Sequence, residues 1–161
     1  WPGELREAMK TALAPPQWAA GQRLLEGKHR RRKLSATGSP FEKTAGYSRA
    51  VVQGDWCFVS GTTGYDYATM TMPDTVEEQT RNCLETIIKA LAEGGFELAD
   101  VVRAHYYITD AAYVDRVFPI LGAYFGDIRP AATMITCGLN TPEMKIEIEV
   151  TALRRTASGK T

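Results

Sequence analysis

The sequence contains no long apolar run and no recognisable export signal. No stretch of the 161-residue chain approaches the roughly 18 consecutive apolar residues that a membrane-spanning helix needs. The first residues also lack the charged segment followed by an apolar segment that marks a secretory signal. From these two absences we expect a cytoplasmic protein without a membrane partner.

The chain also has no excess of charge of either sign. Its 19 basic and 19 acidic residues give a net charge of zero, so the whole molecule has no electrostatic attraction to nucleic acid. One local exception is the basic run Lys28–Lys33. Such a run is found both in contacts to acidic surfaces and in solvated linkers. We favour the linker and do not expect nucleic acid as a partner.

Cysteine and histidine are scarce. Cys57, Cys83 and Cys137 are odd in number, widely spaced and set among apolar residues, which is typical of reduced thiols in a core rather than of a disulfide framework. Only His29 and His105 accompany them, and no two cysteines are close in sequence. A structural zinc site is therefore not expected.

What the sequence does contain is an alternation of β-prone and helical segments. Two helices are expected, one beginning at the capping box Thr75–Glu78 and ending at Gly94, the other running from Asp110 to Gly126 with a kink or break at Pro119. The expected strands form a hairpin, a single strand and a second hairpin: Ser48–Val52 with Trp56–Ser60, Asp100–Thr109, and Ala132–Cys137 with Lys145–Leu153. This order predicts an α+β domain with both helices on one face of a sheet. The uncovered second face predicts oligomerisation.

Composition suggests three parts in the chain. A shift toward Ser, Thr, Gly and Pro near residue 38 predicts an N-terminal extension with a basic linker over residues 1–38. The folded domain is then expected over residues 39–155, followed by a tail over residues 156–161.

The last predicted strand carries an acidic face. Ile146, Ile148 and Val150 alternate with polar residues, so Glu147 and Glu149 share the opposite face. Two neighbouring carboxylates raise the pKa of one of them, which suits a general acid or base. The alternative is that both glutamates form only the polar side of an amphipathic strand.

Several short segments, in this order and at these separations, resemble the YjgF/RidA family, also known as endoribonuclease L-PSP or reactive intermediate deaminase. No single segment is specific, and together they cover roughly residues 39–155. The segments are Ser39–Glu42, Gly46–Ala50, Val59–Gly61, Gln79, Val102–Asp110, Arg129–Ala131 and Lys145–Glu149.

The resemblance implies a chorismate-mutase-like single domain with a mixed sheet, assembled as a homotrimer with small-molecule clefts between subunits. It also implies hydrolysis of reactive enamines and imines, formed from amino acids such as serine and threonine, to keto acids and ammonia. Neither a metal nor a cofactor takes part in that chemistry.

By position in the family pattern, Tyr47, Ser60 and Tyr107 line the cleft, and Glu147 orders the water. Both tyrosines are equally compatible with a packing role. His105 falls on the same strand face as Tyr107 and is interpreted as a packed or interfacial residue rather than a base.

The family's arginine, which holds the substrate carboxylate, is missing. It follows Pro-Ala in the deaminating members, whereas Pro130 and Ala131 are followed here by Ala132, which we expect to line the pocket together with Met134. Arg129 lies three positions upstream, roughly 10 Å away in an extended chain and on the opposite face. Arg49 or an arginine of another subunit is left open as a substitute.

Without this arginine, efficient deamination of 2-imino acids is not expected, because alanine offers a carboxylate neither charge nor donor. The chain is interpreted as a cofactor-independent deaminase or hydrolase of other small imines or enamines. Two alternatives remain open: a ligand-binding or regulatory trimer without turnover, and the ribonuclease activity of the family's older name.

Overall fold

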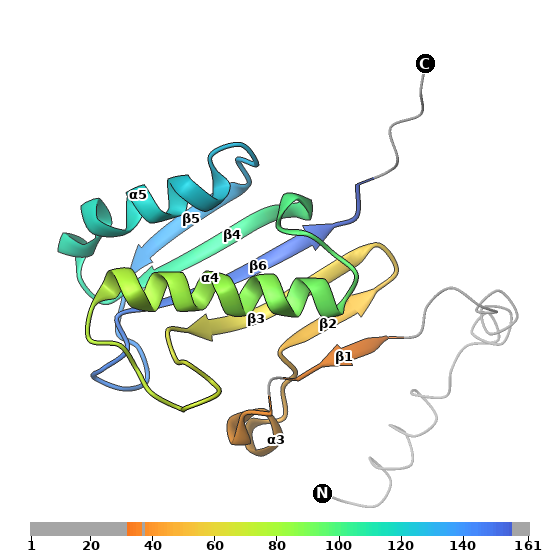
Figure 1. Cartoon of the computed structure of the whole chain (residues 1–161), viewed down its shortest axis with the longest axis horizontal. Coiled ribbons are helices and arrows are strands. Elements are labelled where there is room, and N and C mark those ends of the chain that lie inside the picture. Colours follow the sequence, from red (N-terminus) through yellow and green to blue (C-terminus); the bar gives the residue numbers. More distant parts are fainter. Residues whose placement is uncertain (1–31, 37, 156–161) are drawn as a thin grey trace, which may run out of the picture. The chain divides into compact units, whose positions relative to one another are not determined.

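A six-stranded sheet and two long helices make up most of the part of the chain that the computed structural model describes, residues 32–36 and 38–155 (Figure 1). Most of the predicted N-terminal extension, including Lys28–Arg31, and the predicted tail 156–161 lie outside the described residues. In chain order the elements are β1 (Lys33–Ser35), α3 (Pro40–Ala45), β2 (Ala50–Gln53), β3 (Trp56–Thr63), α4 (Val76–Glu93), β4 (Val101–Ile108), α5 (Val114–Phe125), β5 (Ala131–Thr136) and β6 (Ile146–Leu153). Short 3-10 turns precede β4 at Leu98–Asp100 and α5 at Ala111–Tyr113.

The sheet is mixed, with the strand order β1-β2-β3-β6-β4-β5. β4 and β5 are parallel, and every other neighbouring pair is antiparallel. The predicted hairpin of β2 and β3 is confirmed, and its turn has Gly54 at a φ of 60°. β1 pairs with β2, so the sheet extends to Lys33, upstream of the residue 39 at which we expected the domain to begin.

The second predicted hairpin is wrong. β5 and β6 are not neighbours, because β4 lies between them and pairs with both. α5 connects β4 to β5 as a crossover, which makes this pair parallel, and the following loop brings the chain back to the centre of the sheet. β6 is therefore a central strand between β3 and β4 (Figure 1).

Both predicted helices lie on the same face of the sheet, as Figure 1 shows. The Thr75 hydroxyl accepts a hydrogen bond from the Glu78 amide at 3.2 Å and begins α4, whose apolar stripe is buried on β3 and β6. Pro119 lies on the exposed side of α5, which is assigned as one helix, so the predicted division does not occur. Among the described residues, no helix combines the length and apolar character needed to cross a membrane.

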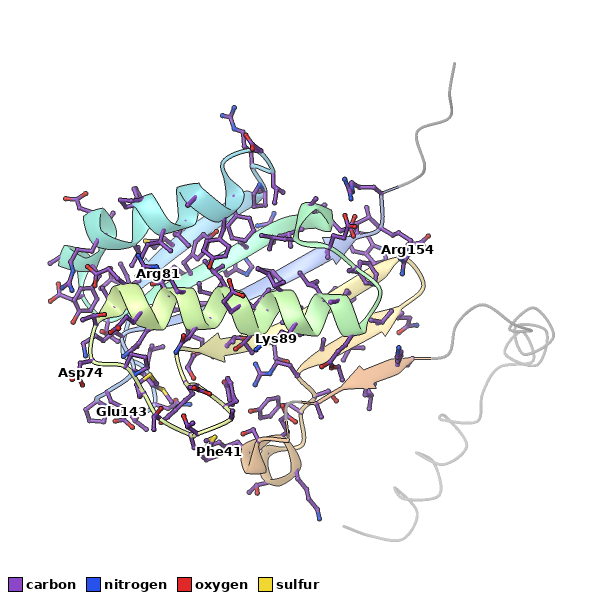
Figure 2. All side chains as sticks on the ribbon, in the orientation of Figure 1. Phe41, Asp74, Arg81, Lys89, Glu143 and Arg154 are labelled. Atoms are coloured by element: carbon purple, nitrogen blue, oxygen red, sulfur yellow. The ribbon has the colours of Figure 1, made fainter. Side chains whose placement is uncertain are left out.

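Gln79 joins two loops at one end of the sheet. Its side chain is fully buried; the amide nitrogen donates to Pro73 O and Glu143 O at 2.7 and 2.8 Å, and its oxygen accepts from the Lys145 amide at 2.8 Å. Asp74 and Glu143, labelled in Figure 2, belong to the loops that it connects. Because one buried side chain bonds backbone groups of both loops, Gln79 helps to fix where β6 begins.

The second face of the sheet is open in the described chain. Residues that pair across neighbouring strands share a face of the sheet. Leu34, Val51 and Phe58 therefore form one row across the open face, and His105 and Glu149 form another pair on the same face. Leu34 is 57% exposed and Phe58 48% exposed, so apolar side chains occupy this surface without cover. The predicted arrangement of two helices on one face is therefore confirmed.

Candidate functional site

Glu147 lies on the open face at the centre of the sheet. It pairs across the strands with Tyr107 of β4 and Thr63 of β3. The register of β3 shifts between Val59 and Thr62, and Gly61 of this segment lies against the Glu147 carboxylate. A Cβ on Gly61 would overlap Glu147 Oε1, so a glycine is needed here for the carboxylate to hold its position.

The predicted sharing of one face by Glu147 and Glu149 is confirmed, and it affects the acidity of Glu147. Partial burial raises the pKa of the Glu147 carboxyl above its ordinary value, and the negative charge of Glu149 raises this pKa further. The positive charge of Arg49 acts in the opposite direction and is the weaker influence. Glu147 therefore accepts a proton more readily than an exposed glutamate.

Glu149 is held by two neighbours on β4. His105 Nδ1 lies 2.7 Å from Glu149 Oε1, and the Tyr107 hydroxyl donates to the same oxygen at 3.0 Å. The hydrogen bond to Glu149 also raises the pKa of Tyr107. Glu147 has no hydrogen-bond partner among residues 32–36 and 38–155, so both of its oxygens are available to a ligand or a water, whereas Oε1 of Glu149 is already bound.

Arg49 is almost completely buried, with 1% of its surface exposed. Its Nη1 donates to Gly61 O and to Thr62 Oγ1, both at 2.9 Å. The guanidinium also lies over the rings of Tyr47 and Tyr67, with its carbon 5.7 and 5.4 Å from the ring centroids. Arg49, left open by the sequence as a substitute for the missing arginine, thus holds the Gly61 segment against which Glu147 packs.

Two further residues expected in the cleft lie around the same segment. The Ser60 hydroxyl donates to Ser48 O at 2.7 Å, which uses this hydroxyl to fix the backbone. Tyr47 is 36% exposed and contacts Arg49 through its ring. Arg49 therefore contacts Tyr47 and the Gly61 segment that follows Ser60, and Gly61 contacts Glu147. Tyr107 is the cross-strand neighbour of Glu147 on β4.

Ala132 and Met134 lie on the other face of the sheet. They pair with Ala104 and Tyr106 of β4, which are buried on the helix-covered side, and Met134 packs against that core. Ala132 is exposed near the start of β5, the edge strand. Within one chain these two residues are thus separated from Glu147 by the sheet itself.

Comparison with known proteins identifies the family. Residues 37–154 match endoribonuclease L-PSP, and the chain belongs to this family, which includes the YjgF and RidA proteins. Rv2704 from Mycobacterium tuberculosis, a member of the YjgF/YER057c/UK114 family with a known crystal structure, has 39% sequence identity to this chain. The match covers 76% of this chain and 99% of Rv2704, with a TM-score of 0.71. NMB1025 from Neisseria meningitidis, a YjgF family protein, is 28% identical with a TM-score of 0.68, covering 81% of this chain and 100% of its own. The SCO2049 protein of Streptomyces coelicolor is 30% identical over 73% of this chain and 89% of its own length.

Two functional features were not predicted from the sequence alone. The position of Gly61 against Glu147 depends on the register shift in β3, which has no local sequence signal. The burial of Arg49 likewise depends on contacts with residues 12 and 13 positions away. An arginine directly before a β-prone run was the one available hint.

Proposed function

We propose that this protein is a cofactor-independent hydrolase of small imines or enamines, with Glu147 as the residue that orders and activates water. The observation that carries the proposal is the state of Glu147: a half-buried carboxylate of raised pKa, packed on Gly61 and without a hydrogen-bond partner in the described chain. A base whose pKa approaches the working pH is the most effective proton acceptor. Family membership supports the same assignment.

The site is completed by a second copy of the chain in a homotrimer. Two features support this part of the proposal. The open face carries uncovered apolar residues such as Leu34, Phe58 and Ile135, which an assembly would bury. Glu147 also lies on the open face of the sheet, whereas Ala132 and Met134 lie on the helix-covered face. A cleft that contains all three residues therefore needs β6 from one copy and β5 from another.

The chemistry needs only water and proton transfers. Glu147 takes a proton from the water as the water oxygen bonds to the imine carbon, and the C=N electron pair moves to nitrogen. Nitrogen takes up that proton from Glu147, which gives a neutral tetrahedral intermediate with a hydroxyl and an amino group. In its collapse the hydroxyl proton passes to nitrogen through Glu147, the C–N bond breaks and ammonia leaves. The net reaction is imine plus water giving a carbonyl compound plus ammonia; an enamine first tautomerises to the imine. The raised pKa of Glu147 suits both the uptake and the return of its proton.

Ala132 determines which imines fit. A guanidinium binds a substrate carboxylate through paired, charge-assisted hydrogen bonds, and alanine offers none. We therefore assign imines and enamines without a carboxylate as the preferred substrates. A 2-imino acid would enter the cleft without a cation at residue 132 to compensate its charge.

Turnover is tested with imines made in place by an amine oxidase from simple primary amines. We expect the purified protein to accelerate decay of imine absorbance and release of ammonia, with saturation at increasing imine. Saturable binding without acceleration would instead support the ligand-binding, regulatory trimer. RNA cleavage is disfavoured because Glu147 and Glu149 place negative charge at the centre of the open face, where it would repel phosphates.

A further inference from the structure

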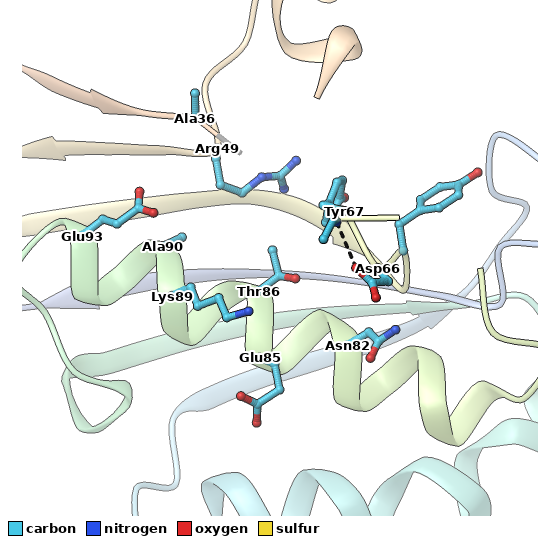
Figure 3. A pocket seen from close by; sticks show the side chains of 12 residues that line it. Ala36, Arg49, Asp66, Tyr67, Asn82, Glu85, Thr86, Lys89, Ala90 and Glu93 are labelled. Atoms are coloured by element: carbon cyan, nitrogen blue, oxygen red, sulfur yellow. Dashed lines mark hydrogen bonds between the residues drawn. The ribbon is translucent and has the colours of Figure 1, made fainter. Parts of the chain in front are cut away.

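A hollow lies beside α4, and Glu147 is not among the residues that line it. It has a volume of about 450 Å³ and lies between α4 and the loop that contains Tyr65, Asp66, Tyr67 and Ala68 (Figure 3). One side is formed by a stripe of α4 residues at helical spacing: Asn82, Glu85, Thr86, Lys89 and Glu93. The remaining wall includes Arg49 and Tyr67, and Figure 3 shows the guanidinium of Arg49 directed toward Tyr67.

Two cations face this hollow. Lys89 is exposed on α4, and its ammonium group has no hydrogen-bond or ion-pair partner within the described part of the chain. Arg49 lies deeper; its Nε is buried without a hydrogen bond and lies 3.7 Å from Glu42 Oε1. Lys89 therefore offers an unpaired positive charge to the hollow, and Arg49, already ion-paired with Glu42, adds a buried cation in the wall behind it.

Three carboxylates also line the hollow, and each is bound to a neutral donor rather than to either cation. Glu85 accepts from the Tyr124 hydroxyl at 2.8 Å, and Glu93 accepts from the Ser35 hydroxyl. Asp66 accepts from the backbone amides of its own loop, including that of Ala68 at 2.9 Å. Lys89 and the three carboxylates therefore line one space without forming ion pairs with each other.

We propose that this hollow binds a small zwitterion, an α-amino acid, with its carboxylate toward Lys89 and Arg49 and its ammonium group toward the acidic side chains. A zwitterion supplies a partner for each set of charges. A phosphate dianion would meet three carboxylates, and an uncharged molecule would leave Lys89 without a partner. The Tyr67 ring adds an apolar surface for the amino-acid side chain.

The proposal is tested by isothermal titration calorimetry of the full chain with three matched probes. L-leucine carries both charges, 4-methylpentanoate only the negative one and L-leucinamide only the positive one. We expect saturable binding of L-leucine, and binding of either singly charged analogue weaker by about tenfold or more, because each lacks one charge-assisted contact. Lys89→Met should weaken L-leucine binding by about the same factor, since it removes the exposed cation and keeps the length of the side chain.

One control variant assigns the signal to this hollow. Lys43→Met removes an exposed lysine of α3 and should leave L-leucine binding unchanged. Three results would each overturn the proposal: no saturable L-leucine binding at millimolar concentrations, equal binding of 4-methylpentanoate, or full binding to Lys89→Met.

Discussion

Glu147→Gln is expected to lower kcat/KM for imine hydrolysis by about 10²- to 10⁴-fold, the usual contribution of a positioned general base. Glutamine fills the same space against Gly61, but its amide does not accept a proton from water. The measurement is the initial rate of ammonia release at several imine concentrations. A variant that keeps the full rate would remove Glu147 from the mechanism.

The pH profile gives an independent signature of the same residue. Glu147 acts in its deprotonated form, so kcat/KM of the unaltered protein should fall as the pH drops through the pKa of Glu147, which burial and Glu149 have raised. Glu147→Gln should lose this acidic limb. Glu149→Gln is the matched control: removing its charge lowers the pKa of Glu147 and should move the limb to lower pH with a smaller loss of rate.

Ala132→Arg should create activity toward 2-imino acids. Ala132 is exposed near the start of β5, so an arginine can be accommodated without displacing the core. A charge-assisted bond to the substrate carboxylate contributes about 1.5–3 kcal/mol, which corresponds to a gain of roughly 10- to 150-fold in kcat/KM. The gain should be specific to substrates with a carboxylate.

Ala132→Gln is the control for this second variant, because it adds a side chain of comparable reach without charge. If glutamine raised the rate as much as arginine, the effect would come from bulk rather than from charge. If arginine raised the rates on charged and uncharged imines equally, residue 132 would not contact the substrate carboxylate.

Local periodicity predicted the segments of this fold better than their pairing. The N-cap at Thr75 and the apolar stripe of α4 are local features, and both are confirmed. The order of β5 and β6 depends on the crossover through α5 and on long-range pairing with β4. Two strand-like runs joined by a loop of Gly, Asn and Pro look like a hairpin, and no local signal places β4 between them.

The acidic face of β6 was predictable because it depends only on the local alternation of side chains along one strand. Period two alone places Glu147 and Glu149 together, and the structure adds their neighbours His105 and Tyr107. Which face Ala132 shares was not predictable, because that depends on the register of β5 with β4. Arg49 illustrates a further limit, since its burial arises from tertiary contacts with Gly61 and two tyrosine rings.

Rates on a matched pair of imines test the central claim most directly. An amino-acid oxidase forms an imine with a carboxylate from phenylalanine, and an amine oxidase forms the imine that lacks it from phenethylamine. With Glu147 as the base and Ala132 in place of the arginine, we expect hydrolysis of both above the buffer rate, and the uncharged imine to be favoured in kcat/KM by about tenfold or more. No acceleration of either imine, or a rate on the 2-imino acid equal to that of arginine-bearing relatives, would contradict the account.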